Sequence, residues 1–211
     1  MIKEIVKWVW SKICLFLRAF FGLSQGGEKM EGEIEGGKVK VELEVRDKDG
    51  KLVQTTEQDA KSWLKNYYYW LAVLMRLGIA QSITDMTGAT TTIIGGAAEN
   101  CWDADSAART GISVGSSNAA FDVNQYCLQS LENSGEVEAL SVDIGAKKVV
   151  LTAVMPFGAE VTIRETGIRI QEALTSTGGH VTFYLERAVL GSPVTVPAGG
   201  SVTVKYTISH A

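Results

Sequence analysis

The 211-residue sequence is poor in the residues that build enzyme sites, metal sites and disulfide frameworks. It has only two histidines, His180 and His210, and three cysteines, Cys14, Cys101 and Cys127. So sparse and odd a set of cysteines gives neither the ligand spacing of a zinc site nor a disulfide framework, although Cys101 and Cys127 could still pair. The two histidines leave a Ser-His-Asp relay without well-placed partners. We therefore expect no catalytic residue, no metal ligand and no cofactor.

An excess of positive charge is also lacking. The chain has 20 basic and 24 acidic residues, which give a formal net charge of −4. A protein that coats nucleic acid is expected to carry a clustered basic patch. The phosphate-binding patterns GxGxxG and GxxxxGK[ST] do not occur either. We therefore expect no direct contact with nucleic acid.

Long uncharged runs are missing even from the most apolar part of the chain, residues 1–23. Lys7, Lys12 and Arg18 interrupt this segment, which disfavours a transmembrane span and a signal peptide. The pattern predicts an amphipathic helix with a wide apolar face, which would pack within an assembly or lie on a membrane surface. The residues predicted for assembly or membrane binding are Ile5, Trp8, Val9, Trp10, Ile13, Phe16, Leu17, Phe20 and Phe21.

A Gly-rich stretch follows at residues 24–37. Two glycine pairs, Gly26-Gly27 and Gly36-Gly37, bracket a charged segment with few apolar anchors. This composition is typical of a flexible linker. We therefore expect three parts: the N-terminal helix, this linker and a domain over residues 38–211.

Alternation of apolar and polar residues is the strongest pattern in that domain. It is clearest at residues 161–165, 181–187 and 202–208, and it is typical of antiparallel strands that bury one face. Residues 38–54 read as a hairpin around Asp49-Gly50, with charges that would protect an edge strand. Shorter strands are expected at 90–94, 111–114, 137–142 and 148–155. The prediction is a mainly β protein with helices, an antiparallel β-sandwich of jelly-roll or Ig-like type.

One helix is predicted within the domain, at residues 56–78. Thr55 and Gln58 resemble a capping box, and Gly78 suits the C-terminal end of a helix. We expect its apolar stripe to pack on the sheet rather than to bind bases or sugars. The stripe consists of Trp63, Leu64, Tyr67, Trp70, Leu71, Leu74 and Met75.

Two charged residues fall on the apolar side of predicted strands. Glu165 has the parity of Ile163, and Arg187 has the parity of Phe183, so both side chains would point inward. Because a lone buried charge is costly, we predict that they form a structural ion pair, which would fix the strand register. Gly167 is interpreted as a β-bulge that shifts the parity of its strand. A bulge one residue earlier would turn Glu165 to solvent instead.

Several short motifs follow one another along the domain. They are VRDKDGKLV at 45–53, KSWLKN at 61–66, GISVGSSN at 111–118, NQYCL at 124–128, RETGI at 164–168, LERAV at 185–189 and PVTVPAGGSVTVKYTI at 193–208. Their order is similar to that in structural proteins of tailed bacteriophages and archaeal viruses, a group of virion surface, tail and capsid-associated proteins. The resemblance covers residues 38–209 and leaves out the N-terminal helix. It implies a non-enzymatic virion protein that assembles in many copies, with itself and other virion proteins as partners.

Two other functions stay open. An apolar helix followed by a β domain is also the layout of pilin-like subunits, which would place the protein in an extracellular filament or at the cell surface. The third hypothesis is a carbohydrate-binding or hydrolytic β-sandwich. Its candidate carboxylates, Glu165 and Glu186, have opposite parity and would point to different faces, whereas glycosidases need two carboxylates flanking one cleft. The expected function is therefore a virion structural protein, whose N-terminal helix serves assembly or contacts membrane lipid.

Overall fold

A computed structural model describes much of the domain predicted after the linker. The described residues are 38–60, 63–74, 81–93, 109–175, 177 and 179–209. They all belong to one unit of the chain, Lys38–Ser209. The helix expected at 1–23, with its nine residues for assembly or membrane binding, and the linker expected at 24–37 lie outside the described residues, as do Cys14, Cys101 and His210.

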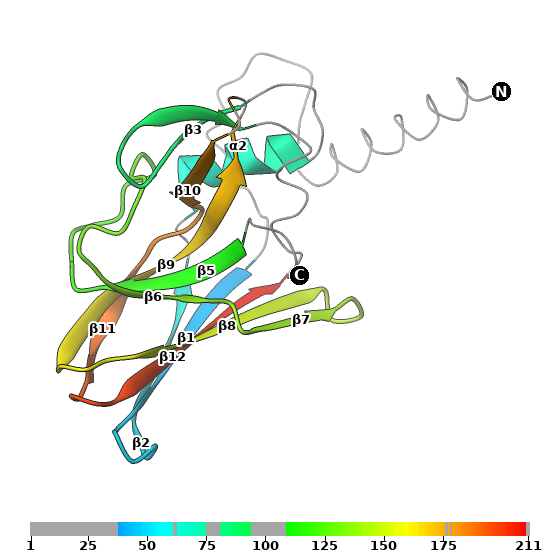
Figure 1. The fold of residues 1–211 in the computed structure, drawn as a ribbon. Coiled ribbons are helices and arrows are strands. Elements are labelled where there is room, and N and C mark those ends of the chain that lie inside the picture. The colour runs from blue at the N-terminus through cyan, green and yellow to red at the C-terminus, as the bar shows by residue number, and fades with distance from the viewer. Residues whose placement is uncertain are drawn as a thin grey trace. The chain divides into compact units, whose positions relative to one another are not determined.

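The first sheet joins the two ends of this unit (Figure 1). It has five antiparallel strands in the order β2-β1-β12-β8-β7. Their bounds are β1 Lys38–Arg46, β2 Leu52–Ala60, β7 Ala139–Asp143, β8 Lys148–Pro156 and β12 Ser201–Ser209. The pairing of β12 with both β1 and β8 joins strands that are far apart in sequence, so the sheet forms only when the whole domain closes.

The β1–β2 hairpin shows how local sequence sets part of this sheet. Asp47 Oδ1 accepts hydrogen bonds from the backbone N–H groups of Asp49 and Lys51, at 3.0 and 2.9 Å. Gly50 has a φ of 78°, in the left-handed region that glycine enters at little cost. The hairpin predicted around Asp49-Gly50 is confirmed, and its second strand runs on to Ala60.

The second sheet is built around β9, Val161–Leu174. On one side β9 pairs with β5 (Arg109–Gly115), which in turn pairs with β6 (Leu131–Glu136). On its other side, β11 (Ala188–Val196) pairs with the first half of β9 and β10 (His180–Tyr184) with the second half. All of these pairs are antiparallel, so the prediction of a mainly β, antiparallel fold is confirmed.

A short helix and a small hairpin complete the described elements. The helix, α2, spans Lys65–Leu74, and the hairpin consists of β3 (Gln81–Thr84) and β4 (Thr90–Ile93). Asn66 joins them: its side chain donates to the Thr84 carbonyl oxygen at 2.7 Å and accepts from the Thr84 N–H at 3.0 Å. The helix is thereby fixed to the start of the hairpin turn.

The prediction that this helix begins at residue 56 is wrong. Residues 56–60 belong to β2, where each pairs with a residue of β1. The side chain of Gln58, expected in a capping box, instead bonds the backbone of β11: it donates to the Val189 carbonyl oxygen at 2.9 Å and accepts from the Gly191 N–H at 2.8 Å. A complete strand ladder thus outweighs the local capping signal.

Side chains from both sheets, from α2 and from the small hairpin form one hydrophobic core. Trp70 of α2 belongs to this core, and Trp63 and Tyr67 pack against it, stacked on each other with ring centroids 3.8 Å apart. These residues of the predicted stripe therefore pack inward, as expected. The members contributed by the strands of the two sheets include Val41, Leu43, Leu151, Met155, Val202, Tyr206, Ile112, Val114, Ile163, Ile168, Phe183 and Val194.

Candidate functional site

Glu165 and Arg187 form an ion pair inside the domain, as the sequence predicted. Glu165 lies in β9, and Arg187 lies in the segment between β10 and β11. Arg187 Nε is 2.6 Å from Glu165 Oε2, and both side chains are 0% exposed. A hydrogen bond between two charged groups at this distance is among the stronger contacts available to a protein.

The backbone path that brings Arg187 to its partner differs from the predicted one. Strand β10 ends at Tyr184, three residues before Arg187. The N–H groups of Leu185 and Glu186 both bond to the carbonyl oxygen of Ile168, at 2.8 and 3.4 Å. Two consecutive donors on one acceptor mark a β-bulge in this segment. The bulge, rather than simple strand parity, directs Arg187 into the interior.

The bulge predicted at Gly167 is therefore wrongly placed. Gly167 keeps regular pairing with Ser113 of β5. Its role is to allow close approach, because a Cβ atom there would lie 2.5 Å from the carbonyl oxygen of Glu186 and 3.1 Å from the Leu128 side chain. Only glycine leaves room for the bulged segment to lie this close to β9.

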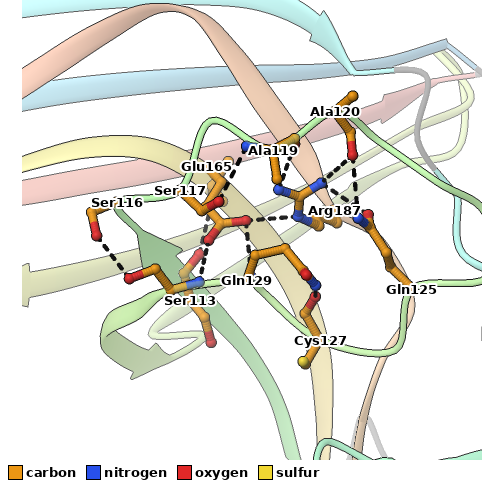
Figure 2. A network of polar contacts seen from close by, with 12 residues as sticks. Ser113, Ser116, Ser117, Ala119, Ala120, Gln125, Cys127, Gln129, Glu165 and Arg187 are labelled. Carbon is orange, nitrogen blue, oxygen red and sulfur yellow. Dashed lines mark hydrogen bonds and ion pairs between the residues drawn. The ribbon is translucent and has the colours of Figure 1, made fainter.

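The Glu165 carboxylate also holds one end of a long loop, residues 116–130, which joins β5 to β6. Oε1 accepts a hydrogen bond from the Ser130 N–H at 2.8 Å, and Oε2 accepts one from the Gln129 N–H at 3.2 Å. With Arg187, the carboxylate therefore has three charge-assisted partners (Figure 2). These bonds offset much of the cost of burying the negative charge.

The Arg187 guanidinium holds the middle of the same loop. Nη2 donates to the carbonyl oxygen of Ala119 at 2.9 Å, and Nη1 donates to Gln125 Oε1 at 2.9 Å (Figure 2). A longer bond from Nη1 reaches the Ala120 carbonyl oxygen at 3.4 Å. The guanidinium thus replaces, for this irregular stretch of backbone, the hydrogen bonds that a regular strand would provide.

Sequence reasoning found the two charges but missed the loop that surrounds them. The available signal was the composition of residues 116–130, which is rich in Ser, Asn, Asp and Gln. Such side chains bond nearby backbone and favour turns: the Asn124 N–H, for example, donates to Asp122 Oδ1 at 2.8 Å. Both charges therefore serve to position backbone, and their bonds lie within the protein.

A second carboxylate is also buried in the domain. Glu186 is 0% exposed, and the Tyr206 hydroxyl donates to its Oε2 at 2.6 Å. Burial, followed by the negative charge of Glu186, raises the pKa of Tyr206 well above its ordinary value. Glu165 and Glu186 are thus both enclosed, whereas glycosidase carboxylates flank an open cleft.

The outer side of the loop is partly apolar. Phe121, Val123 and Tyr126 are exposed, and residues Asp122 and 124–129 line a shallow hollow of roughly 360 Å³. Cys127 in this hollow is a free, half-buried thiol. Burial and the neighbouring Glu165 carboxylate raise the pKa of Cys127, which disfavours the reactive thiolate.

Strand β7, at the edge of the first sheet, also exposes apolar side chains. All five of its residues are exposed, and they include Leu140 and Val142, with Ile144 just beyond the strand. Apolar side chains gathered on a surface mark a contact site more often than apolar side chains scattered singly do. Strand β7 and the loop at 116–130 are thus candidate contact surfaces.

Among the described residues, no three His, Cys, Asp or Glu side chains come together as metal ligands would. Within the same residues, no helix is both long and apolar enough to cross a membrane.

Comparisons with protein-family models, with curated proteins and with solved structures gave no match to this chain.

Proposed function

We propose that this chain is a virion structural protein that assembles in many copies into a capsid, tail or filament and catalyses no reaction. Its building block would be a β-sandwich of jelly-roll or Ig-like type, which the two sheets around one core support. Its partners would be other copies of itself and other virion proteins. The family resemblance of residues 38–209 adds to this proposal.

The proposal rests on the different roles of the buried charges and of the exposed apolar side chains. The Glu165–Arg187 pair bonds the protein's own backbone, which rigidifies a surface loop. Exposed apolar side chains lie at that loop and along β7. A rigid body with apolar patches is suited to protein–protein contact rather than to chemistry on a small molecule.

The N-terminal segment would attach or join these bodies. Its aromatic and aliphatic residues, among them Trp8, Trp10 and Phe16, alternate with Lys7 and Lys12. We propose that they contact neighbouring copies or membrane lipid. Trp8→Ser combined with Phe16→Ser in the full chain should reduce assembly or attachment and leave the unfolding transition of the domain unchanged.

The deciding experiment is electron microscopy of the purified full chain together with its mass by light scattering over a range of concentrations. Regular multi-copy particles or filaments, and presence of the chain in purified virions, are the expected results. A strictly monomeric protein that is absent from particles would overturn the proposal.

A further inference from the structure

The apolar side chains of β7 form a single row. Leu140 is 47% exposed, Val142 is 59% exposed, and Ile144 in the following turn is 85% exposed. Leu140 pairs with Leu151 of β8, and Val142 pairs with Val149 of the same strand. Leu151 is buried in the core, and Val149 packs against it. Because paired residues share one face of a sheet, the row continues the inner face of the first sheet into solvent.

The opposite edge strand, β2, exposes Leu52 and Val53 at its start, but the rest of the strand carries mainly polar side chains. The side-chain amide of Gln58, on β2, both donates a hydrogen bond to the backbone of β11 and accepts one from it. Glu57 makes an ion pair with Lys40 at 2.5 Å. Charged and engaged side chains protect an edge strand from pairing with another chain.

Strand β7 has little of this protection. Among the described strands it pairs with β8 alone and ends the order of the sheet. Its sequence, ALSVD, contains one charged residue, Asp143. A sheet edge of this kind offers unpaired backbone groups and an apolar face to another strand.

We propose that β7 is a self-association edge, where two copies of this chain pair antiparallel so that the first sheet continues from one copy into the next. The inference rests on the proposed multi-copy assembly and names one of its contact surfaces. The pairing is isologous, with a two-fold axis through the middle of the strand.

The strand is its own complement in such a pair. With Val142 on the axis, Leu140 faces Ile144 of the other copy, and Asp143 faces Ser141. With Ser141 on the axis, Leu140 faces Val142, and Asp143 faces Ala139. In both registers apolar residues meet apolar residues and no two carboxylates face each other, so a second copy satisfies both the shape and the charge of this edge.

The length of β7 also sets the strength of the contact. Five residues form an interface well below the roughly 1,200–2,000 Å² buried in stable complexes. The contact between two isolated copies is therefore weak, and it becomes effective when other contacts hold many copies close together. This behaviour suits a subunit that assembles only at high local concentration.

The test compares two substitutions in the full chain. Val142→Lys places a charge in the middle of the β7 edge. Val154→Lys places the same charge on β8, at a residue that is 37% exposed and pairs with Thr203 inside the sheet. Self-association, measured by sedimentation velocity, should weaken at least tenfold in Val142→Lys and stay within twofold of the original in Val154→Lys. Thermal melts should show that both variants fold.

A cross-linking experiment identifies the occupant of the edge. Cys14, Cys101 and Cys127 are replaced by Ser, and a single cysteine is introduced by Val142→Cys or, as the control, Val154→Cys. A short bis-maleimide should link two copies through residue 142, a link that is necessarily between molecules, and should not link them through residue 154. The inference is overturned if 142 links instead to a different protein that carries a thiol, or if no 142–142 link forms in assembled material.

The failures of the two proposals are distinguishable. If the original protein stays monomeric and forms no particle, the proposed function fails, and the edge inference fails with it. If the original protein assembles and Val142→Lys assembles equally well, the proposed function stands and only the β7 contact is overturned. Equal loss of assembly in both lysine variants would also contradict the inference, because the effect would not be specific to β7.

Discussion

The same kind of ion pair occurs in two settings in this molecule. Glu165 and Arg187 are 0% exposed and lie in different structural segments. The Glu42 and Lys205 side chains are 27% and 40% exposed, lie directly opposite each other on β1 and β12, and approach to 2.5 Å. Both ion pairs have short N–O distances, but only the buried pair also bonds the backbone of another segment. The comparison shows that the environment and the further partners of an ion pair, more than its length, decide what it does.

Removing one member of the buried pair should have the largest effect. Glu165→Leu or Arg187→Met leaves an uncompensated buried charge, so each single change should lower the free energy of unfolding by about 3–5 kcal/mol. Urea denaturation of the full chain measures the free energy of unfolding.

The double variant sharpens the result. Glu165→Leu combined with Arg187→Met should cost much less than the sum of the single changes, because no charge is left unpaired. Some cost should persist, since the N–H of Ser130 and the carbonyl oxygen of Ala119 lose their partners. Additive single effects would show that the two charges do not interact.

Tyr206→Phe tests the other buried carboxylate, Glu186. The change removes the hydroxyl that donates to Glu186, and a hydrogen bond to a charged group contributes roughly 1.5–3 kcal/mol. The expected result is a lower urea midpoint at pH 7 with unchanged far-ultraviolet circular dichroism. An unchanged midpoint would mean that the Glu186 carboxylate does not depend on Tyr206.

The same tyrosine gives a pH dependence with a definite sign. Burial raises the pKa of Tyr206 in the folded domain above its ordinary value of 10.0. The unfolded chain therefore releases this proton first, so the contribution is present below about pH 10 and is lost as the pH rises further. Burial also raises the pKa of Tyr67 to about 12, and this acts in the same direction. Between pH 9 and 11 (roughly the range around an unperturbed tyrosine pKa), the stability of Tyr206→Phe should fall less steeply than that of the original protein, but it should still fall.

Gly167→Ala should have a comparable or smaller effect. The new methyl group would lie 2.5 Å from the Glu186 carbonyl oxygen, so the segment that carries Arg187 must shift. Overpacking of this kind costs about 1–3 kcal/mol. Gly158→Ala is the matched control, because a Cβ there would meet nothing within 4 Å. Equal stability of the two variants would contradict the close approach.

The smallest effect is expected at the exposed pair. Lys205→Met should cost about 0–1 kcal/mol at low salt and less at high salt. The hydrogen bond from Lys205 lowers the pKa of Glu42 below its ordinary value of 4.5. The contribution is therefore present above pH 4.5 and is lost as the pH falls below it, so the original protein and Lys205→Met should converge at acidic pH. If Lys205→Met lowered the free energy of unfolding as much as the change at Glu165 does, the contrast between the exposed and the buried ion pair would be contradicted.

The sequence by itself determined the elements that depend on local pattern. Alternation predicted strands where β1, β8, β9 and β12 lie, and the Asp-Gly signal predicted the turn at Gly50. The parity of Glu165 and Arg187 also led to the prediction of a buried pair, because inward charges need partners wherever they lie, although a bulge and not strand parity turns Arg187 inward.

The tertiary structure alone decided how those elements are used. Residues 56–60 have a helix-capping signal, yet they form part of β2 because β1 supplies a full ladder and β11 engages Gln58. The bulge at Leu185 and Glu186, and the loop that the ion pair holds, depend on contacts between segments distant in the chain. No local pattern encodes such contacts, since a strand ladder and a buried charge are satisfied only when the remote partner arrives.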